Sequence, residues 1–155
     1  MRCALLTVGK PKAKFFREGI EEYRKRLKAW GGCELMHVRP AAGNLPRPQA
    51  MELEAQRLLG IIKRGDCLWA MDMRGKPMSS EQWAQAIAQA GSEGFKRLVV
   101  VIGGHAGLGK EVVSSAQRVV SLGPVTLSHE LAALVVMEQL YRAHCILSGH
   151  PYHRR

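Results

Sequence analysis

The sequence predicts an α/β protein whose mostly parallel β-sheet is flanked by helices on both faces. Short runs of apolar, β-branched residues alternate with segments of helical periodicity, which is typical of a parallel sheet with covered faces. Two of the apolar runs break directly into glycines, at Gly103-Gly104 and at Gly123. The length of 155 residues suits one domain, so residues 1–155 are expected to form a single unit.

The first half of the chain is expected to alternate strands with helices. In Phe15–Trp30 the apolar residues recur at helical spacing, and Gly31-Gly32 ends the helix. Arg39–Pro48 contains three prolines and no periodicity, which indicates a mobile loop that suits a substrate lid as well as a plain linker. The expected elements are strands at Cys3–Val8, Glu34–Val38 and Cys67–Met73, and helices at Phe15–Trp30 and Gln49–Lys63.

The second half continues the alternation. Arg74–Pro77 is expected to be a loop, and Ser79 with Gln82 three residues later forms a capping box that begins a helix ending near Ala90. The remaining elements are a turn at Gly91–Gly94, a strand at Leu98–Ile102, a helix at Lys110–Gln117, a strand at Arg118–Leu122, a loop at Gly123–Glu130, a helix at Leu131–Leu147 and a tail at Ser148–Arg155.

The charge balance favours polyanionic partners. Twenty-three Lys and Arg residues face thirteen Asp and Glu residues, which gives a net charge of +10. Long-range attraction and counterion release then favour binding to nucleic acid. The basic face of the first helix, which includes Arg17, Arg24 and Lys28, is consistent with simple solvation or with RNA contact.

The cysteines and the longest apolar segment indicate a cytoplasmic protein with no metal and no membrane span. Cys3, Cys33, Cys67 and Cys145 form no Cys-x-x-Cys pair and have no histidine at zinc-ligand spacing, so buried reduced thiols are expected. Leu131–Leu147 is shorter than the roughly 20 residues that span a bilayer, and it carries charged side chains.

The glycine-rich segment after Leu98–Ile102 allows three interpretations. The Rossmann pattern G-x-G-x-x-G fails because Val112 stands where its last glycine should be. The P-loop pattern fits from Gly104 to Lys110, but Glu111 replaces the Ser or Thr that would bind Mg²⁺, and a carboxylate there repels phosphates. The third interpretation is a loop that holds an adenosine-type ligand through backbone groups, without Lys or Mg²⁺.

Three strand ends are candidates for the walls of such a pocket. They are Met71–Met73, Gly103-Gly104 and Leu122–Leu127. Because ligands of open α/β sheets bind outside the carboxyl ends of the strands, we expect the three segments to meet at one edge of the sheet.

The C-terminal end of the chain is the second unusual feature. Residues 149–155 contain two histidines, a tyrosine and two arginines, and this density favours recognition of an RNA base and phosphate over a frayed terminus. The preceding helix, Leu131–Leu147, is apolar nearly all round. Such a helix is buried against its own core or a partner subunit, and we favour a homodimer interface.

Four segments read LVVVIGGHAG, SLGPVTLSH, EQLYRAHCILSGHPYHRR and LWAMDMRGKPMSSEQ. Together they resemble the small SPOUT-type RNA methyltransferases and, more narrowly, the ribosomal RNA large subunit methyltransferase H family. The resemblance covers essentially the whole chain. Its most specific part is the terminal HPYHR, joined to YRA one helix earlier.

The resemblance implies a SPOUT-type α/β knot, in which the C-terminal part forms a trefoil knot, and a tight homodimer. It implies S-adenosyl-L-methionine as the cofactor and no metal. The implied substrate is a pseudouridine of large-subunit (23S) ribosomal RNA, methylated at ring nitrogen 3 on the assembled ribosome.

The resemblance also implies which residues form the site. The implied cofactor-binding residues are Met71, Gly103, Leu122, Gly123, Pro124, Val125, Thr126 and Leu127. The implied catalytic residues are Tyr152, His153, Arg154 and His129, and the implied RNA-binding residues are Arg142, Arg154 and Arg155.

Each implied catalytic residue has an expected role. Methyl transfer from a sulfonium is an in-line displacement that requires alignment and no metal. The imide nitrogen of the base must lose a proton, and His153 or His129 is the candidate base. Arg154 is expected to stabilise the resulting anion or to bind phosphate, and Tyr152 to stack on a base. In a homodimer the tail of one subunit is expected to complete the pocket of the other.

The chain departs from the family pattern at a few positions. The glycine loop reads GGHAG where GGPEG is expected, so His105 and Ala106 argue against an acid there. Met71 replaces an expected Leu, and Glu130 stands where Pro is expected. Two other functions stay open: a ribosome-binding factor that has lost the cofactor, and a P-loop NTPase that binds ATP with Mg²⁺.

Overall fold

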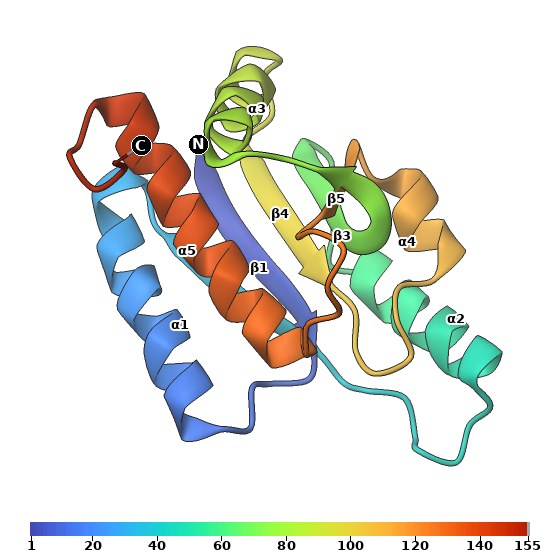
Figure 1. Ribbon diagram of the computed structural model, residues 1–155. Helices are drawn as coiled ribbons and strands as arrows, with labels where there is room; N and C mark the ends of the chain where they lie inside the picture. The colour runs from blue at the N-terminus through green and yellow to red at the C-terminus, as the bar shows by residue number, and fades with distance from the viewer. Residues whose placement is uncertain (155) are drawn as a thin grey trace.

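The computed structural model describes residues 1–154, which form a five-stranded sheet with helices on both faces (Figure 1). The elements are β1 (Arg2–Val8), α1 (Lys14–Leu27), a short 3₁₀ helix (Lys28–Trp30), β2 (Cys33–Val38), α2 (Arg47–Leu59), β3 (Asp66–Pro77), α3 (Ser80–Ser92), β4 (Arg97–Ile102), α4 (Lys110–Ser115), β5 (Arg118–Ser121) and α5 (His129–Ser148). Neighbouring strands pair in parallel, in the order β2-β1-β4-β3-β5. The predicted α/β class is therefore confirmed, while the trefoil knot stays a prediction.

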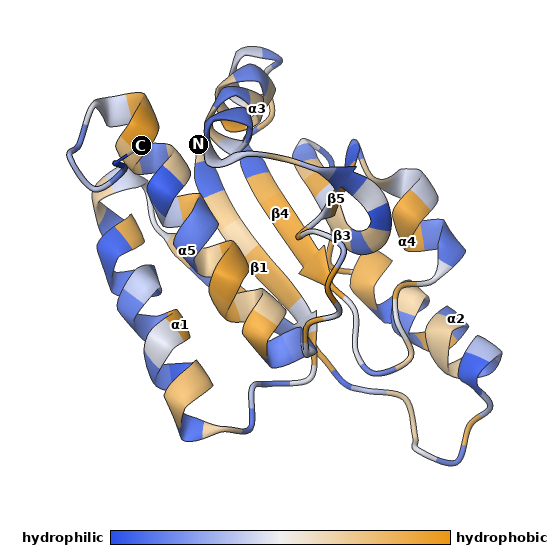
Figure 2. Ribbon diagram, viewed as in Figure 1, coloured by the Kyte–Doolittle hydropathy of each residue, from blue (hydrophilic) through white to orange (hydrophobic). Residues whose placement is uncertain are grey.

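The central strand β4 is buried on both sides, as its continuous apolar run predicts. Leu98 and Val100 pack into a core beneath α1, α3 and α5, whereas Val99 and Val101 pack into a second core beneath α2 and α4. In Figure 2 the strands are coloured mostly as hydrophobic, whereas the helices that cover them carry both hydrophobic and hydrophilic residues. Alternate residues of one strand thus hold both helical layers onto the sheet.

Helix α5 lies on the sheet in contact with both α1 and α3. Met137 and Leu140 are completely buried in the core below it. Gly19 lets α1 approach closely, since a Cβ at that position would lie 2.9 Å from Leu134 Cδ1. The helix runs antiparallel to the strands, from their carboxyl ends back towards their amino ends (Figure 1). Its 20 residues span about 30 Å at 1.5 Å per residue.

The four cysteines are free and buried, which confirms the prediction of reduced thiols. Burial raises the pKa of the Cys3 thiol to about 12. Within residues 1–154, no helix combines the length and the apolar character needed to cross a bilayer.

Strand β3 is longer than predicted, because the expected loop Arg74–Pro77 belongs to it. Val120 pairs first with Met71 and then again with Lys76, so the residues between them bulge out of the sheet. Gly75 makes this return possible, since a Cβ there would lie 2.6 Å from the backbone of β5. The sequence Arg-Gly-Lys-Pro is typical of a turn. It forms a strand here because it pairs with β5, which lies more than 40 residues later in the chain.

Several helix boundaries also differ from the prediction. Helix α3 continues through Gly91 to Ser92, where a turn was expected, and α4 ends at Ser115 and not at Gln117. Helix α2 runs over Arg47–Leu59 and not Gln49–Lys63, because Pro48 is accepted in its first turn. Helix α5 begins two residues earlier than predicted, because the Ser128 hydroxyl caps it and accepts the Leu131 N–H at 3.2 Å.

We predict that Gly75→Ala lowers the free energy of unfolding by about 1–3 kcal/mol, because the added methyl group would push β5 away from β3. Gly91→Ala is the matched control. Gly91 lies in α3 with no heavy atom within 4 Å of an added Cβ, so this change should raise the free energy of unfolding by up to about 1 kcal/mol. Urea denaturation followed by tryptophan fluorescence measures both, and an unchanged Gly75→Ala midpoint would contradict the close approach.

Candidate functional site

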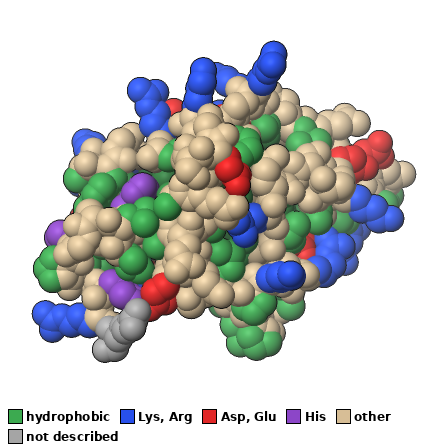
Figure 3. All heavy atoms as spheres, turned by 90° about the horizontal axis from the view of Figure 1, so that it is seen from above, with side chains coloured by type: hydrophobic (Ala, Val, Ile, Leu, Met, Phe, Trp, Pro, Cys, Tyr) green, Lys and Arg blue, Asp and Glu red, His purple; other side chains and the backbone are tan. Residues whose placement is uncertain are grey.

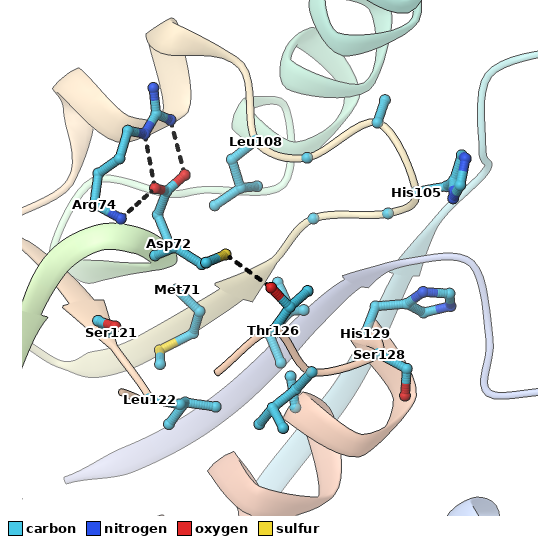
Figure 4. A pocket seen from close by; sticks show the side chains of 18 of the residues that line it. Met71, Asp72, Arg74, His105, Leu108, Ser121, Leu122, Thr126, Ser128 and His129 are labelled. Carbon is cyan, nitrogen blue, oxygen red and sulfur yellow. Dashed lines mark hydrogen bonds and ion pairs between the residues drawn. The ribbon is translucent and has the colours of Figure 1, made fainter. Parts of the chain in front are cut away.

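A cavity of about 760 Å³ opens at the carboxyl ends of β3, β4 and β5. This volume lies within the range of roughly 300–1,000 Å³ that is typical of ligand and cofactor pockets. The three predicted segments, Met71–Met73, Gly103-Gly104 and Leu122–Leu127, meet in its walls (Figure 4). Of the predicted cofactor-binding residues, Pro124 alone is not part of the lining, although it lies in the same loop.

The glycine loop forms a tight turn at the wall of the cavity. The Gly107 N–H donates to the Gly104 carbonyl at 3.1 Å, with His105 and Ala106 at the two corners. Gly107 has a φ of +89°, and a Cβ on Gly103 would lie 2.8 Å from the Gly107 carbonyl carbon. Glycine is therefore required at both ends of the turn, whereas the two corner positions accept other residues. The GGHAG sequence forms this turn without an acid.

The loop after β5 forms the facing wall. In Figure 4, Met71 and Leu122 lie on one side of the cavity, and His129 lies on the other. The Thr126 hydroxyl donates to Met73 Sδ at 3.6 Å, which connects this loop to the bulge of β3. The loop is thus held across the end of the sheet, and Leu122, Thr126 and Leu127 line the cavity from it.

Charged groups stand at the rim of the cavity. Arg74 Nε and Nη2 each donate to the Asp72 carboxylate at 2.8 Å. These hydrogen bonds lower the pKa of Asp72 below its ordinary value of 3.8, so the carboxylate is ionised at neutral pH. Arg47 Nε donates to the Ala106 carbonyl at 3.1 Å and ties α2 to the glycine loop. Lys110, which a P-loop would use to bind phosphate, is not among the described lining residues.

The segment predicted as a mobile loop, Arg39–Pro48, is anchored to α2 along its first part. The buried carboxylate of Glu54 accepts the Ala41 N–H at 2.9 Å. Arg57 Nη1 donates to the carbonyl groups of Arg39 and Pro40, at 2.7 and 3.0 Å. These contacts place the loop beside the glycine turn.

The C-terminal tail folds back onto α5. The Tyr152 ring packs against Tyr141 with a centroid distance of 4.7 Å, and burial raises the pKa of its hydroxyl. That hydroxyl donates to Glu138 Oε1 at 3.1 Å, and the Arg142 guanidinium lies over the ring. Arg142 also pairs with Glu138 and donates to His153 Nδ1 at 3.3 Å. The tail is therefore an ordered part of the fold.

The tail does not reach the cavity of its own chain. His129, at the start of α5, lines the cavity, whereas the tail follows the other end of the helix and folds back only as far as Glu138, nine residues or about 13 Å along the helix from His129. Arg142 lies with the tail, and Arg155 lies outside the described residues. The structure therefore brings the predicted cofactor residues together with His129, but it does not bring the tail to the cavity of its own chain.

The fold and the cavity define a class of protein: a parallel α/β protein that holds a ligand between a glycine turn and the loop after the edge strand. A family model described as predicted SPOUT methyltransferase matches residues 1–153. The chain therefore belongs to the SPOUT methyltransferase family, and membership of this family implies a methyl donor.

Two curated relatives are similar to nearly the whole chain. Proteins of Acetivibrio thermocellus and Xanthomonas oryzae pv. oryzae, both named ribosomal RNA large subunit methyltransferase H, are 37% and 38% identical over 159 and 156 residues. The alignments cover 99% of this chain and 100% and 99% of the relatives. The structure of a probable methylase family protein from Haemophilus influenzae has a TM-score of 0.52 and 15% identity, covers 99% of this chain and 70% of that chain, and shows the fold.

Sequence reasoning missed some contacts around the site. The spacing of Asp72 and Arg74 at a strand end was a usable signal for a charged pair beside the cavity. The i,i+4 spacing of Glu138 and Arg142 was a second one. The contact of Arg47 with the glycine loop could not be predicted from a sequence pattern, because it depends on how α2 packs against the sheet.

We predict that Glu138→Gln releases the tail, because Glu138 accepts hydrogen bonds from both Arg142 and Tyr152. Losing the charge at the centre of this network should make chymotryptic cleavage after Tyr152 about tenfold faster. Glu18→Gln is the control, since its pair with Lys14 is highly exposed. Equal cleavage rates in wild type and Glu138→Gln, measured by mass spectrometry, would show that Glu138 does not hold the tail.

Proposed function

We propose that this protein is an S-adenosyl-L-methionine-dependent methyltransferase that methylates ring nitrogen 3 of a pseudouridine in large-subunit (23S) ribosomal RNA. It acts in the cytoplasm on the assembled ribosome, through a single domain that spans residues 1–155. The observation that carries the proposal is the match of 99% of this chain to relatives named ribosomal RNA large subunit methyltransferase H. The pseudouridine and the position of the methyl group rest on the resemblance in sequence.

The net charge of +10 supports an RNA substrate. Figure 3 shows Lys and Arg side chains standing out along the margins of the face seen from above. Histidine side chains gather on the side of that face where α5 ends.

The residues of the cavity fit S-adenosyl-L-methionine. The missing Cβ at Gly103 lets the glycine turn fold against its own strand in the cavity wall, and Met71 with Leu122 offers apolar surface for a base. Asp72 and Arg74 both line the cavity, where their ion pair leaves no net charge. When bound, the cofactor supplies an electrophilic methyl group carried on a sulfonium.

The residues of the protein must then position the base and accept the proton of its imide nitrogen. The imide nitrogen must be deprotonated before it attacks, and His129 at the cavity wall or His153 in the tail takes the proton. Arg154 stabilises the resulting anion, or binds a substrate phosphate together with Arg142 and Arg155. Tyr152 stacks on a base.

The separation of tail and cavity supports a homodimer in which each tail completes the site of the other chain. Apolar side chains are exposed at the end of the molecule that holds the cavity: Phe15 is 65% and Leu131 is 37% exposed. The Lys12 N–H donates to the Glu130 carboxylate and holds the start of α1 beside the start of α5. This face suits an isologous contact that lays two copies of α5 in opposite directions.

We predict that the protein binds S-adenosyl-L-methionine in calorimetric titration and does not bind ATP with Mg²⁺. Gly103→Ala should weaken the affinity by about tenfold or more, because its Cβ collides with the Gly107 backbone in the cavity wall. Gly43→Ala is the control, because Gly43 does not line the cavity and an added Cβ there would meet no heavy atom within 4 Å. This variant should bind the cofactor as wild type does. Binding of ATP with Mg²⁺ would favour an NTPase, and binding of neither ligand would favour a ribosome-binding factor.

Arg154→Ala is expected to lower methyl transfer to ribosomes by roughly 10²–10³-fold while the affinity for the cofactor is retained. The assay follows a labelled methyl group into ribosomes that lack this modification. Arg64→Ala removes an exposed arginine from the turn between α2 and β3 and serves as the control. Turnover of Arg154→Ala at the wild-type rate would contradict the role of the tail.

A further inference from the structure

A second cavity of about 680 Å³ lies between α3, the end of β3 and the start of β5. It is lined by Lys76, Arg118 and a set of glutamines, and we refer to it as the amide groove. The glutamines that line it are Gln82, Gln85, Gln89 and Gln117. Arg74 and Val120 line both cavities, so the amide groove lies next to the cofactor cavity.

Local sequence patterns build the groove. Gln82, Gln85 and Gln89 recur at helical spacing, so they share one exposed face of α3, while Trp83 and Ile87 point into the core. On the opposite side, the close approach at Gly75 brings β3 back to β5 and places Lys76 at the edge of the groove.

The glutamines leave hydrogen-bond donors available. The Gln117 side-chain carbonyl accepts the Leu68 N–H at 2.6 Å, and that of Gln82 accepts the Ser79 N–H at 2.7 Å. Because the carbonyl oxygens are occupied, the NH₂ groups of these two amides remain for a ligand. The side-chain amide of Gln85 makes no hydrogen bond within the described part of the chain.

The groove is cationic. Arg118 is held in place by its hydrogen bond to Gln89 Oε1 at 2.8 Å, and its guanidinium lies 5.9 Å from the ring centre of the buried Trp69. Lys76 has no ion-pair partner within residues 1–154, and none of the described lining residues is acidic. The Glu93 carboxylate accepts a hydrogen bond from Gln89 Nε2 at 2.7 Å. Arg74 is neutralised by Asp72.

This chemistry matches a nucleic-acid strand better than a protein. Protein-binding sites centre on aromatic anchors in apolar pockets, and the described lining of the groove contains no aromatic side chain. Cations suit phosphates, and amide NH₂ groups suit base edges and 2′-hydroxyls. We propose that the amide groove binds single-stranded RNA next to the nucleotide that enters the cofactor cavity, with Lys76 and Arg118 at its phosphates. The proposal rests on the proposed function for the identity of that nucleotide.

Direct RNA binding tests the groove without any methyl transfer. The probe is a fluorescein-labelled single-stranded RNA of about 20 nucleotides, titrated with the full-length protein at several salt concentrations. Lys76→Ala should reduce the slope of log K against log salt by about 1, and the double variant Lys76→Glu with Gln85→Glu should bind about tenfold more weakly. Arg64→Glu changes the charge outside the groove by two units, as Lys76→Glu does within it, and should weaken binding less than twofold.

A loss of RNA affinity in the double variant could also come from misfolding. Gln85→Arg separates the two causes, because it adds a cation to the groove and should tighten RNA binding severalfold, which misfolding would not do. Wild-type affinity in the double variant, or in Gln85→Arg, would overturn the proposal.

Ribosome methylation separates this proposal from the function on which it rests. The double variant should raise KM for ribosomes about tenfold and leave the cofactor affinity unchanged, as expected for lost substrate contacts. If wild type methylates ribosomes and the double variant does so equally well, the groove proposal fails while the proposed function stands. If wild type does not methylate but the double variant still loses RNA affinity, the proposed function fails and the groove stands. Weaker ribosome binding with unchanged affinity for the RNA probe would assign the groove to a ribosomal protein and overturn the proposal.

Discussion

The rigid seating of α5 on the sheet is the constraint on which the rest of the structure depends. Its buried residues, such as Met137 and Leu140, pack into the core that α1 and α3 share. The helix places His129 at the cavity, whereas the tail that follows its other end folds back only to Glu138, and no residue of 149–154 lines the cavity. A chain built in this way cannot supply both halves of its site in this conformation, and a second copy becomes part of the proposed chemistry.

Close backbone approaches shape both cavities. At Gly103 the absence of a Cβ lets the glycine turn fold against its own strand, and at Gly75 it lets β3 rejoin β5 after a bulge. The bulge carries Asp72 and Arg74 to the rim of the first cavity and delivers Lys76 to the second. The bulge of β3 thus connects the proposed cofactor site with the proposed RNA-binding groove.

Much of the fold follows from local sequence patterns. The apolar run at Leu98–Ile102 predicts a strand buried on both faces, and the capping box at Ser79 predicts the start of α3. The meeting of three strand ends in one cavity follows from the parallel topology. The end of β3 does not, because its Arg-Gly-Lys-Pro sequence is turn-like and only the distant backbone of β5 makes it a strand. The docking of the tail depends in the same way on Glu81 and Glu138, which no local pattern connects to His153 and Tyr152.

The most direct test of the central claim is complementation between two damaged subunits. One subunit carries Gly103→Ala and keeps an intact tail, and the other carries Arg154→Ala and keeps an intact cavity. The two are coexpressed with different affinity tags, and the heterodimer is purified through both tags. If each tail completes the cavity of its partner, one of the two sites is whole, and the heterodimer should show about half of the wild-type methyl transfer per dimer. A heterodimer as inactive as the two variant homodimers would show that tail and cavity act within one chain, contrary to this account.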